Sequence, residues 1–357
     1  MLFPVSGYHY DVTTRKQGRG AAFNPPNRFE QLYVEPLPEE EQGEVPTQYF
    51  YDSSRSILAE NDSPDLPFKY SINPYRGCEH GCIYCYARST HEYLGLSAGT
   101  DFESRILIKT DAPRLLENAF KRKSWQPQTV VFSGNTDCYQ PIERRLELTR
   151  RCLEVFLKYR NPVSVITKSF LVTRDLDIFE RLAALDLIEV SMSITTLDPE
   201  LARAMEPRAS TPSRRLEALS MLSERGIPTS VNAAPVIPGL TDEELPAILR
   251  ESALRGAVTA CYILVRLPLA VETLFVDWLH RELPLRAPKV LNRLREVRGG
   301  RLSDGRYGTR KSGEGEMAES IRGLFELSCR KYGLNHREIH LSTRHFLRHG
   351  PKQLEIF

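Results

Sequence analysis

Long apolar runs are absent from this sequence of 357 residues. No eighteen consecutive residues are apolar, so we expect no transmembrane helix. An excess of one charge is also absent, because 48 Lys and Arg residues nearly balance 46 Asp and Glu residues and leave a net charge of +2. The first residues, Met-Leu-Phe-Pro-Val-Ser, lack the charged start and length of a secretion signal. The sequence therefore predicts a soluble protein located in the cytoplasm.

Cysteine is scarce, and its pattern excludes the common structural uses. Seven cysteines are present, an odd number, and a reducing cytosol would disfavour disulfides between them. Structural zinc usually takes ligands from two separated pairs and ferredoxin-type clusters use four cysteines, but no second pair exists here. A Cys3His zinc site completed by His80 or His91 stays as an alternative. The scattered cysteines are Cys138, Cys152, Cys261 and Cys329.

Three of the cysteines are concentrated in one short segment, Arg76-Gly-Cys-Glu-His-Gly-Cys-Ile-Tyr-Cys-Tyr86. Cys78, Cys82 and Cys85 are separated by three and then two residues. Three thiolates at this spacing suit three corners of an iron–sulfur cube and leave the fourth iron without a protein ligand. A small molecule can bind an open iron and react there. We therefore predict that these three residues are the ligands of a catalytic cluster.

From about residue 68 onward, apolar β-branched segments alternate with helical patterns. This alternation predicts a parallel sheet with helices on its outer face. The cysteine segment directly follows the first strand, at the end of the sheet where active sites of such folds lie. The expected strands are Tyr70–Ile72, Thr129–Phe132, Val163–Thr167, Leu187–Ile194, Thr229–Ala234 and Cys261–Val265, and the expected helices are 142–159, 199–205, 212–225, 243–255, 271–280, 288–297 and 316–332.

The two ends of the chain differ from this central part. Residues 1–66 are rich in Pro, Gly and charge and predict an extended, poorly structured arm that wraps the domain. We expect the alternating domain over residues 67–285 and a basic helical extension over residues 286–357. Ten Lys or Arg and three acidic residues lie between Arg281 and Lys311. Stretches of this kind often bind phosphate, so nucleic-acid contact is one expectation and a solvated helix face is the other.

The motif Cys-x3-Cys-x-aromatic-Cys is the signature of the radical S-adenosylmethionine enzymes, which this chain resembles from about Ser56 to Leu334. The segments Tyr70–Cys78 and Ser133–Glu143 resemble the bacterial branch related to spore photoproduct lyase, also called DNA-repair-photolyase-like. The resemblance implies an incomplete (β/α)6 barrel, a [4Fe–4S] cluster and S-adenosylmethionine. One electron from the reduced cube would break the sulfur–C5′ bond and leave a 5′-deoxyadenosyl radical.

The resemblance also implies residues that bind S-adenosylmethionine. Tyr84 occupies the aromatic position of the motif and would pack by the adenine, with an ordinary core tyrosine as the alternative. Thr136 would accept a hydrogen bond from the methionine ammonium while Asp137 supports the turn, although such a cluster also follows ordinary strands. Lys168, at the end of the third strand, would contact the cofactor, because a buried ammonium needs an anionic partner.

Further candidates lie on the fourth and fifth strands. Ser191 and Ser193 alternate with apolar residues and so face one side, which suits ribose hydroxyls, and the resemblance favours Ser193. Arg208 is a candidate for the methionine carboxylate, with a surface ion pair as the alternative. Asn232 is expected at a ribose or adenine edge, and Val236–Gly239 at an apolar adenine wall.

One departure from the related lyase concerns its hydrogen-atom donor. The lyase uses a cysteine at the position where this chain has Gly134. Cys138 or Tyr139 is the candidate to replace that donor, with a structural role for Cys138 as the alternative. The thymine-dimer reaction of the lyase is therefore not carried over to this chain.

The expected function is hydrogen abstraction from a macromolecular substrate, in the first place nucleic acid during DNA repair or modification. The alternatives are modification of RNA or a peptide and, in another class, a non-catalytic iron–sulfur or zinc module that binds nucleic acid. Flavodoxin or ferredoxin is the expected electron donor. The C-terminal residues Gln353, Leu354, Ile356 and Phe357 resemble the peptide by which bacterial repair proteins bind the polymerase sliding clamp, with a strand packed on its own domain as the alternative.

Overall fold

The computed structural model describes residues 19–29 and 45–348, and every structural statement below refers to these residues. Its main sheet has seven strands in the order β10-β9-β8-β7-β6-β3-β2. Six of them pair in parallel, and β2 (Leu58–Glu60) runs antiparallel to β3 at one edge. The parallel strands are β3 (Tyr70–Ile72), β6 (Val130–Phe132), β7 (Val163–Thr167), β8 (Ile188–Ser193), β9 (Thr229–Val236) and β10 (Thr259–Leu264).

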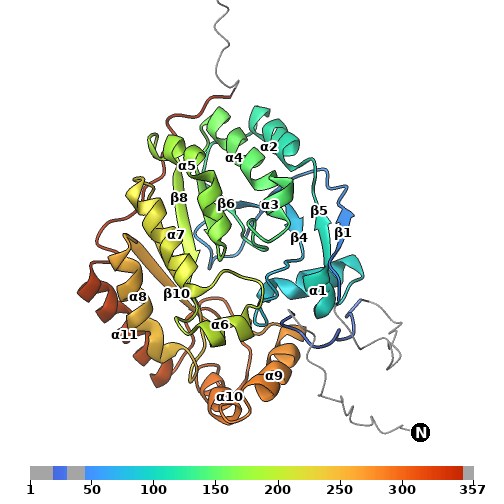
Figure 1. Cartoon of the computed structure of the whole chain (residues 1–357), viewed down its shortest axis with the longest axis vertical. Coiled ribbons are helices and arrows are strands. Elements are labelled where there is room, and N and C mark those ends of the chain that lie inside the picture. The colour runs from blue at the N-terminus through green and yellow to red at the C-terminus, as the bar shows by residue number, and fades with distance from the viewer. Residues whose placement is uncertain (1–18, 30–44, 349–357) are drawn as a thin grey trace, which may run out of the picture.

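Helices connect successive parallel strands and lie along the outer side of the sheet, as Figure 1 shows for α4, α5, α7 and α8. The sheet does not close, so the fold is an incomplete (β/α)6 barrel, and the predicted fold class is confirmed. All six predicted strands are present because each is a short run rich in apolar residues, mostly buried in five of the strands and partly buried in β10. The outer helices are α2 (Ala112–Lys121), α4 (Leu148–Tyr159), α5 (Leu176–Ala183), α7 (Pro212–Glu224) and α8 (Leu245–Leu254).

Shorter segments complete the ends of the barrel. Proline stands in the first turn of α6, and the side chain of Asp198 accepts hydrogen bonds from the next backbone N–H groups, which fixes where that helix begins. The helix α11 packs against α8. No helix described here is long and apolar enough to cross a membrane. These remaining helices are α1 (Thr100–Ser104), α3 (Glu143–Leu146), α6 (Pro199–Met205), α9 (Ala270–Glu282), α10 (Ala287–Glu296) and α11 (Glu316–Tyr332), with 3-10 helices η1 (Tyr86–Leu94), η2 (Phe170–Asp175) and η3 (Asp242–Glu244).

The sequence did not predict a second, smaller sheet beside the barrel. It has the order β1-β5-β4, formed by β1 (Gln48–Tyr51), β4 (Tyr75–Arg76) and β5 (Arg105–Ile108). The arm predicted over residues 1–66 therefore contributes two strands within its described part, β1 and β2. Both strands are short and polar or exposed, so only their pairing with β5 and β3 stabilises them.

The core consists of two large parts. One fills the space between the sheet and its outer helices, and the other lies between α6, α9, α10 and the cysteine loop, by which we mean residues 77–85. The loop begins directly after β4, which follows β3, at the carboxyl end of the parallel strands. The fold thus places the loop at the mouth of the barrel.

Candidate active site

The backbone of the cysteine loop is held by the fully buried side chain of Arg88. Its Nε donates to the carbonyl of Cys82 at 2.9 Å, Nη2 donates to the carbonyl of Gly81 at 3.1 Å and Nη1 donates to that of Gly99 at 3.0 Å. Glu103 pairs with the same guanidinium and neutralises its charge. A planar group with five donors satisfies several carbonyls at once, which fixes the loop without using its thiols.

Residues 19–21 pack against Glu103, the carboxylate that pairs with Arg88. The backbone N–H of Gly20 donates to one carboxylate oxygen of Glu103 at 2.9 Å, and that of Ala21 donates to the other at 2.8 Å. Arg19 donates to the carbonyl of Glu103 at 2.7 Å. Glu103 therefore connects the N-terminal segment to Arg88 and through it to the cysteine loop.

The thiols of Cys78, Cys82 and Cys85 line one cavity of ≈ 330 Å³ at the mouth of the barrel. Burial raises the pKa of all three thiols, that of Cys82 to about 12. The nearby ammonium of Lys168 acts in the opposite direction on Cys82 and Cys85. Three thiols on the wall of one cavity, on a loop whose carbonyls are bonded elsewhere, fit the ligand set of an iron–sulfur cube.

A Cys3His zinc site fits these residues less well than an iron–sulfur cube does. Within residues 19–29 and 45–348, no three His, Cys, Asp or Glu side chains converge as the ligands of one metal ion do. The Nδ1 of His80 lies 3.4 Å from a carboxylate oxygen of Asp137, and the Nε2 of His91 hydrogen-bonds to the carbonyl of Arg105 at 2.9 Å. His80 lines the cavity beside the thiols, but its Nδ1 faces Asp137, and His91 is not part of the cavity wall.

Tyr84, between two of the cysteines, lines the cavity and is tied to the strand side of the barrel. Its hydroxyl donates to the buried carboxylate of Glu206, which also accepts from Thr195 at 2.8 Å and pairs with Arg215. Arg215 in turn donates to the carbonyl of Ser193 at 3.1 Å. Burial would raise the pKa of Glu206, but Arg215 and other partners outweigh it and lower the pKa to about 2. The carboxylate therefore stays ionised as an anchor for the loop.

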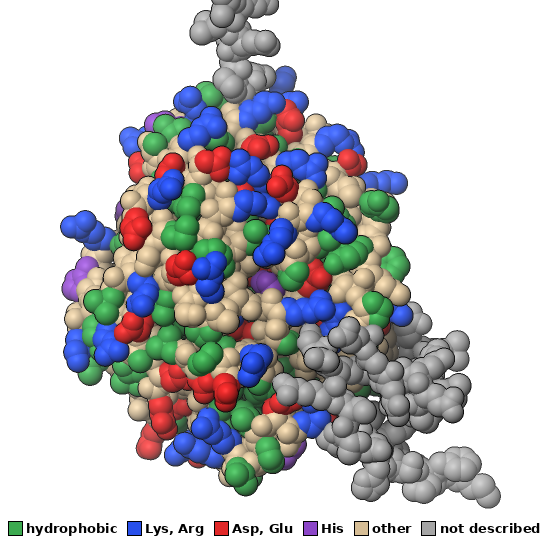
Figure 2. All heavy atoms as spheres, in the orientation of Figure 1, with side chains coloured by type: hydrophobic (Ala, Val, Ile, Leu, Met, Phe, Trp, Pro, Cys, Tyr) green, Lys and Arg blue, Asp and Glu red, His purple; other side chains and the backbone are tan. Residues whose placement is uncertain are grey.

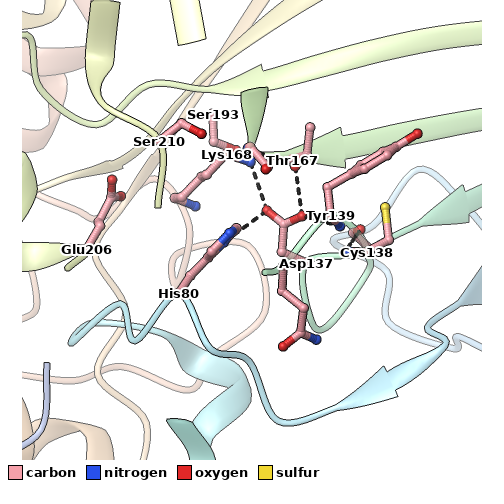
Figure 3. Close-up of polar contacts among 12 residues, drawn as sticks. His80, Asp137, Cys138, Tyr139, Thr167, Lys168, Ser193, Glu206 and Ser210 are labelled. Carbon is pink, nitrogen blue, oxygen red and sulfur yellow. Dashed lines mark hydrogen bonds and ion pairs between the residues drawn. The ribbon is translucent and has the colours of Figure 1, made fainter. Parts of the chain in front are cut away.

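Asp137, after β6, organises the ends of two neighbouring strands (Figure 3). It accepts hydrogen bonds from the hydroxyl of Thr167 at 2.7 Å, from the backbone N–H of Lys168 at 2.8 Å and from that of Tyr139 at 2.9 Å. Burial would raise its pKa, but His80 and these donors outweigh that effect and lower the pKa to about 2. Asp137 thus supports the turn, as the sequence predicts, and links it to the cysteine loop through His80.

The side chain of Lys168 extends to the side of Asp137 on which His80 and Glu206 lie (Figure 3). It lines the cavity, with Nζ 5.8 Å from the centre of the Tyr84 ring. Burial would lower its pKa, but Cys82 and Glu206 outweigh burial and raise it. Within the described part of the chain this ammonium has no hydrogen-bond partner, so a charged donor is available to a ligand in the cavity.

Three further predicted residues line the cavity: Thr136, Ser193 and Asn232. The hydroxyl of Thr136 donates to the carbonyl of Tyr75 at 2.8 Å, and its oxygen retains acceptor capacity. Ser193 and Asn232 are paired across β8 and β9, so their side chains lie beside each other. The cavity therefore brings together candidates from β6, β7, β8 and β9 opposite the three thiols.

The comparison with protein families decides the class of this site. The model of the Radical SAM superfamily matches residues 72–251, which include the cysteine loop, Asp137, Lys168 and Asn232. The chain belongs to the radical SAM superfamily. Its cofactors are accordingly a [4Fe–4S] cluster and S-adenosylmethionine, and it is an enzyme.

The chain is also similar to individual proteins. An uncharacterized protein of Mycobacterium tuberculosis (strain H37Rv) is 36% identical over 234 residues, which cover 65% of this chain and 68% of that one. An uncharacterized protein of Methanocaldococcus jannaschii is 34% identical over 176 residues, 49% of this chain and 63% of that one. Spore photoproduct lyase complexed with dinucleoside spore photoproduct has a similar fold, with a TM-score of 0.56, 18% identity and 80% of each chain covered.

Not all residues predicted from the radical SAM resemblance reach the cavity. Arg208 lies outside its lining, with Nη1 3.6 Å from the carboxylate of Glu79 and 3.2 Å from the hydroxyl of Thr47. Arg208 thus forms an ion pair, as the alternative held, but with a buried carboxylate and not at the surface. Ser191 bonds to Ser230 within the barrel instead of lining the cavity. The expected apolar wall is built from Ala234, Pro235, Ile263 and Leu264, not from Val236–Gly239.

The two candidate hydrogen donors also lie away from the cavity. Cys138 and Tyr139 are fully buried in the main core and are not part of the cavity wall. In Figure 3 both point to the side of Asp137 opposite Lys168. The hydroxyl of Tyr139 donates to Asp175 at 2.8 Å. This placement matches the structural role considered for Cys138, and the prediction of a donor role gains no support from it.

Sequence reasoning missed several residues of this radical SAM cavity, among them Tyr86, Arg266, Arg310 and Lys311. Tyr86 directly follows the last cysteine, and Arg266 follows β10 at the same end of the sheet as the other candidates. A search for polar residues just after each strand would have found Arg266. Arg310 and Lys311 end the basic stretch, and nothing in the sequence indicates that the chain returns there to the barrel mouth.

Proposed function

We propose that this radical SAM enzyme abstracts a hydrogen atom from a nucleic acid, in DNA repair or modification. The observation that carries the proposal is that one cavity has the three thiols on its wall and also basic side chains, Arg266, Arg310 and Lys311. A substrate that enters there meets positive charge close to the reactive centre. Nucleic acids carry the regular negative charge that such residues attract.

In this proposal some residues bind S-adenosylmethionine and others hold the cysteine loop in place. Lys168, Ser193 and Asn232 hold S-adenosylmethionine, with the ammonium of Lys168 supplying the cation for the methionine carboxylate or the ribose hydroxyls. Tyr84 is fixed by Glu206 and so keeps the loop and the strand ends at a constant separation. When bound, the cluster and S-adenosylmethionine supply a 5′-deoxyadenosyl radical, formed by one-electron cleavage of the sulfur–C5′ bond with release of methionine. Apolar residues of the wall, such as Ile263, exclude water from this space.

The electron comes from outside the chain in this proposal, from flavodoxin or ferredoxin in the cytoplasm. We further propose that the C-terminal peptide with Gln353, Leu354, Ile356 and Phe357 binds the polymerase sliding clamp. These four residues lie outside the described part of the structure. A pull-down with the clamp tests this point, because deletion of residues 353–357 should abolish retention, and unchanged retention would contradict it.

The enzymatic proposal is tested by anaerobic reconstitution with iron and sulfide, followed by reduction with dithionite. We expect brown protein with cluster absorbance, and 5′-deoxyadenosine plus methionine as products. Photocrosslinking of single-stranded DNA and RNA to the same protein, followed by peptide mapping, tests the substrate class. Crosslinks should fall between Arg281 and Lys311 or around the cavity. A protein that forms 5′-deoxyadenosine but crosslinks no nucleic acid would instead favour a peptide substrate.

A further inference from the structure

Arg266, Arg310 and Lys311 line the cavity in addition to Lys168, and among the described residues they share a single nearby carboxylate, that of Asp65. Arg310 pairs with Asp65 through Nε, and the ammonium of Lys311 donates to the backbone carbonyl of Asp65. Arg310 also donates to the hydroxyl of Ser63, and the positive charges of Arg266 and Arg310 lower the pKa of Lys311 in addition to the larger effect of burial. Half-buried positive charges without enough counter-charge are costly unless an anion joins them.

Arg266 is the member of this group without a partner. Among the described residues, the guanidinium of Arg266 has no hydrogen bond and no ion pair, and its Nε is buried without an acceptor. The neighbouring Arg298, in contrast, donates to the carbonyl of Val265 at 2.8 Å and is used structurally. Arg266 lines the cavity that the thiols also line. A planar fork of free donors at this place suits the two oxygens of a phosphate group.

Tyr86 provides a flat apolar surface next to that fork. The Cζ of Arg266 lies 5.8 Å from the centre of the Tyr86 ring, and both residues line the cavity. The hydroxyl of Tyr86 donates to the carbonyl of Gly134 at 2.6 Å, which fixes the orientation of the ring. The residue is nevertheless 46% exposed. An exposed aromatic ring of fixed orientation is a stacking surface that accepts any base.

We propose that Arg266 and Tyr86 form a nucleotide subsite, in which Arg266 binds the phosphate bidentately and the base stacks on Tyr86. Arg310 and Lys311 add positive charge beside the phosphate. The subsite places the nucleotide next to Cys85, since Tyr86 is the following residue in the chain. This inference rests on the proposed function and deepens it, because it names the unit of the nucleic acid that is held at the reactive centre.

The test is fluorescence anisotropy with labelled single-stranded DNA and RNA of mixed sequence, on the anaerobically reconstituted full chain. Arg266→Gln should weaken binding about tenfold, and Arg266→Lys should restore only part of it, because an ammonium lacks the fork. Arg114→Gln is the control with the same change of charge, since Arg114 is 64% exposed on α2 and pairs only with Asp111. Tyr86→Leu should also weaken binding about tenfold, whereas Tyr86→Phe keeps the ring and most of the affinity.

Two further measurements separate the possible explanations. Equilibrium dialysis with S-adenosylmethionine should give the same affinity for Arg266→Gln and the wild type, and iron content should be unchanged. Equal weakening of cofactor and oligonucleotide binding would place Arg266 at the cofactor and overturn the subsite. Oligonucleotide binding that is the same in Arg266→Gln, Arg114→Gln and the wild type would also overturn it, while the proposed nucleic-acid substrate would stand.

The remaining outcomes concern a wild type that binds no oligonucleotide, which would contradict the proposed function. Binding of nucleoside monophosphates is then measured by equilibrium dialysis. A wild type that binds them, with about tenfold loss in Arg266→Gln, would support the subsite without the nucleic acid. A wild type that binds neither oligonucleotides nor nucleoside monophosphates would overturn both the subsite and the nucleic-acid substrate. Binding of an acidic peptide that is lost in Arg266→Gln would instead assign Arg266 to a peptide substrate and overturn the nucleotide subsite.

Discussion

Gly20 is the residue where the N-terminal segment comes closest to the cysteine loop. A Cβ at this position would overlap the backbone carbonyl oxygen of Gly81, which has a φ of +67° and therefore cannot easily shift. We expect Gly20→Ala to lower the free energy of unfolding by about 1–3 kcal/mol and to reduce the iron bound per chain after reconstitution. Thermal unfolding and iron analysis of the purified protein measure the two effects.

The matched control for this substitution is Gly323→Ala on α11. Its added Cβ meets no atom within 4 Å, and alanine favours the helix by about 0.5–1 kcal/mol. The control should therefore be neutral or stabilising, with normal iron content. If Gly20→Ala were as stable and as iron-rich as the wild type, the contact between the N-terminal segment and the cysteine loop would have no role in cluster binding.

Lys168 allows a direct test of cofactor binding. Its ammonium lies in the cavity without a hydrogen bond to any described residue, so Lys168→Gln removes a charged donor from S-adenosylmethionine but no hydrogen bond from the protein. We expect affinity for S-adenosylmethionine to fall about tenfold, since hydrogen bonds to charged groups are among the stronger ones, while iron content stays normal. Equilibrium dialysis compares it with Lys158→Gln, which changes a surface lysine of α4. Equal affinities in both variants would remove Lys168 from the site.

The charged residues that organise this site could not be predicted from the sequence. Arg88 and Arg215 are almost completely buried and pair with Glu103 and Glu206, but charged residues of this kind are usually exposed. Their pairing depends on how distant segments pack, which one sequence does not show. The thiols of the cysteine loop were predictable for the opposite reason, because their arrangement depends only on spacing within nine residues.

The same distinction explains which strands the sequence predicts. Five of the six parallel strands are mostly buried segments such as Val163–Thr167, and β10 is partly buried. The predicted limits of all six differ by at most about two residues from those in the structure. The strands β1, β2, β4 and β5 have only two to four residues each. Two of them, Gln48–Tyr51 and Leu58–Glu60, are largely exposed and carry no alternation that indicates a strand. They exist because a partner strand is present, and a local pattern does not contain that information.

The helix η1, which follows the cysteine loop, is attached to β5 by a histidine that must stay neutral. The Nε2 of His91 donates to the carbonyl of Arg105 at 2.9 Å, and its Nδ1 is buried without a partner. Burial lowers the pKa of His91 from 6.5 to about 4. As pH falls from about 6.5 to about 4, the unfolded chain takes up a proton that the folded chain does not, so the free energy of unfolding decreases.

We therefore expect the metal-free chain to lose about 2 kcal/mol between pH 7 and pH 5 through His91 alone. His91→Phe should be less stable at pH 7, because the hydrogen bond to β5 is lost, but its stability should decrease less over this interval. Urea unfolding at the two pH values measures the difference. The control His340→Phe changes an exposed histidine and should follow the wild type. A pH dependence of His91→Phe equal to that of the wild type would show that His91 titrates normally.

Charged side chains of both signs are mixed over one face of the protein. Figure 2 shows acidic and basic side chains interspersed over the face that it presents. The basic stretch from Arg281 to Lys311 follows this pattern. Arg298 is buried against backbone carbonyls, and Arg293 pairs with Glu296 and Arg306 with Asp304. The sequence predicts one basic surface, whereas the structure uses many of these residues for internal or paired contacts.

This distribution leads to a prediction for the salt dependence of nucleic-acid binding. If Arg266, Arg310 and Lys311 make the phosphate contacts, about three phosphates are neutralised, and the slope of log K against log salt for single strands should be about −2. Use of all ten basic residues of the stretch would give a slope of about −7. Anisotropy titrations of one single-stranded oligonucleotide over a range of salt concentrations measure the slope. Removal of one contact in Arg266→Gln should make it shallower by about 0.7, whereas Arg114→Gln should leave it unchanged. A steep slope that is the same in Arg266→Gln and the wild type would contradict binding in the cavity. It would indicate binding at the surface of α10 and its N-terminal end, where Arg286 and Arg295 are exposed.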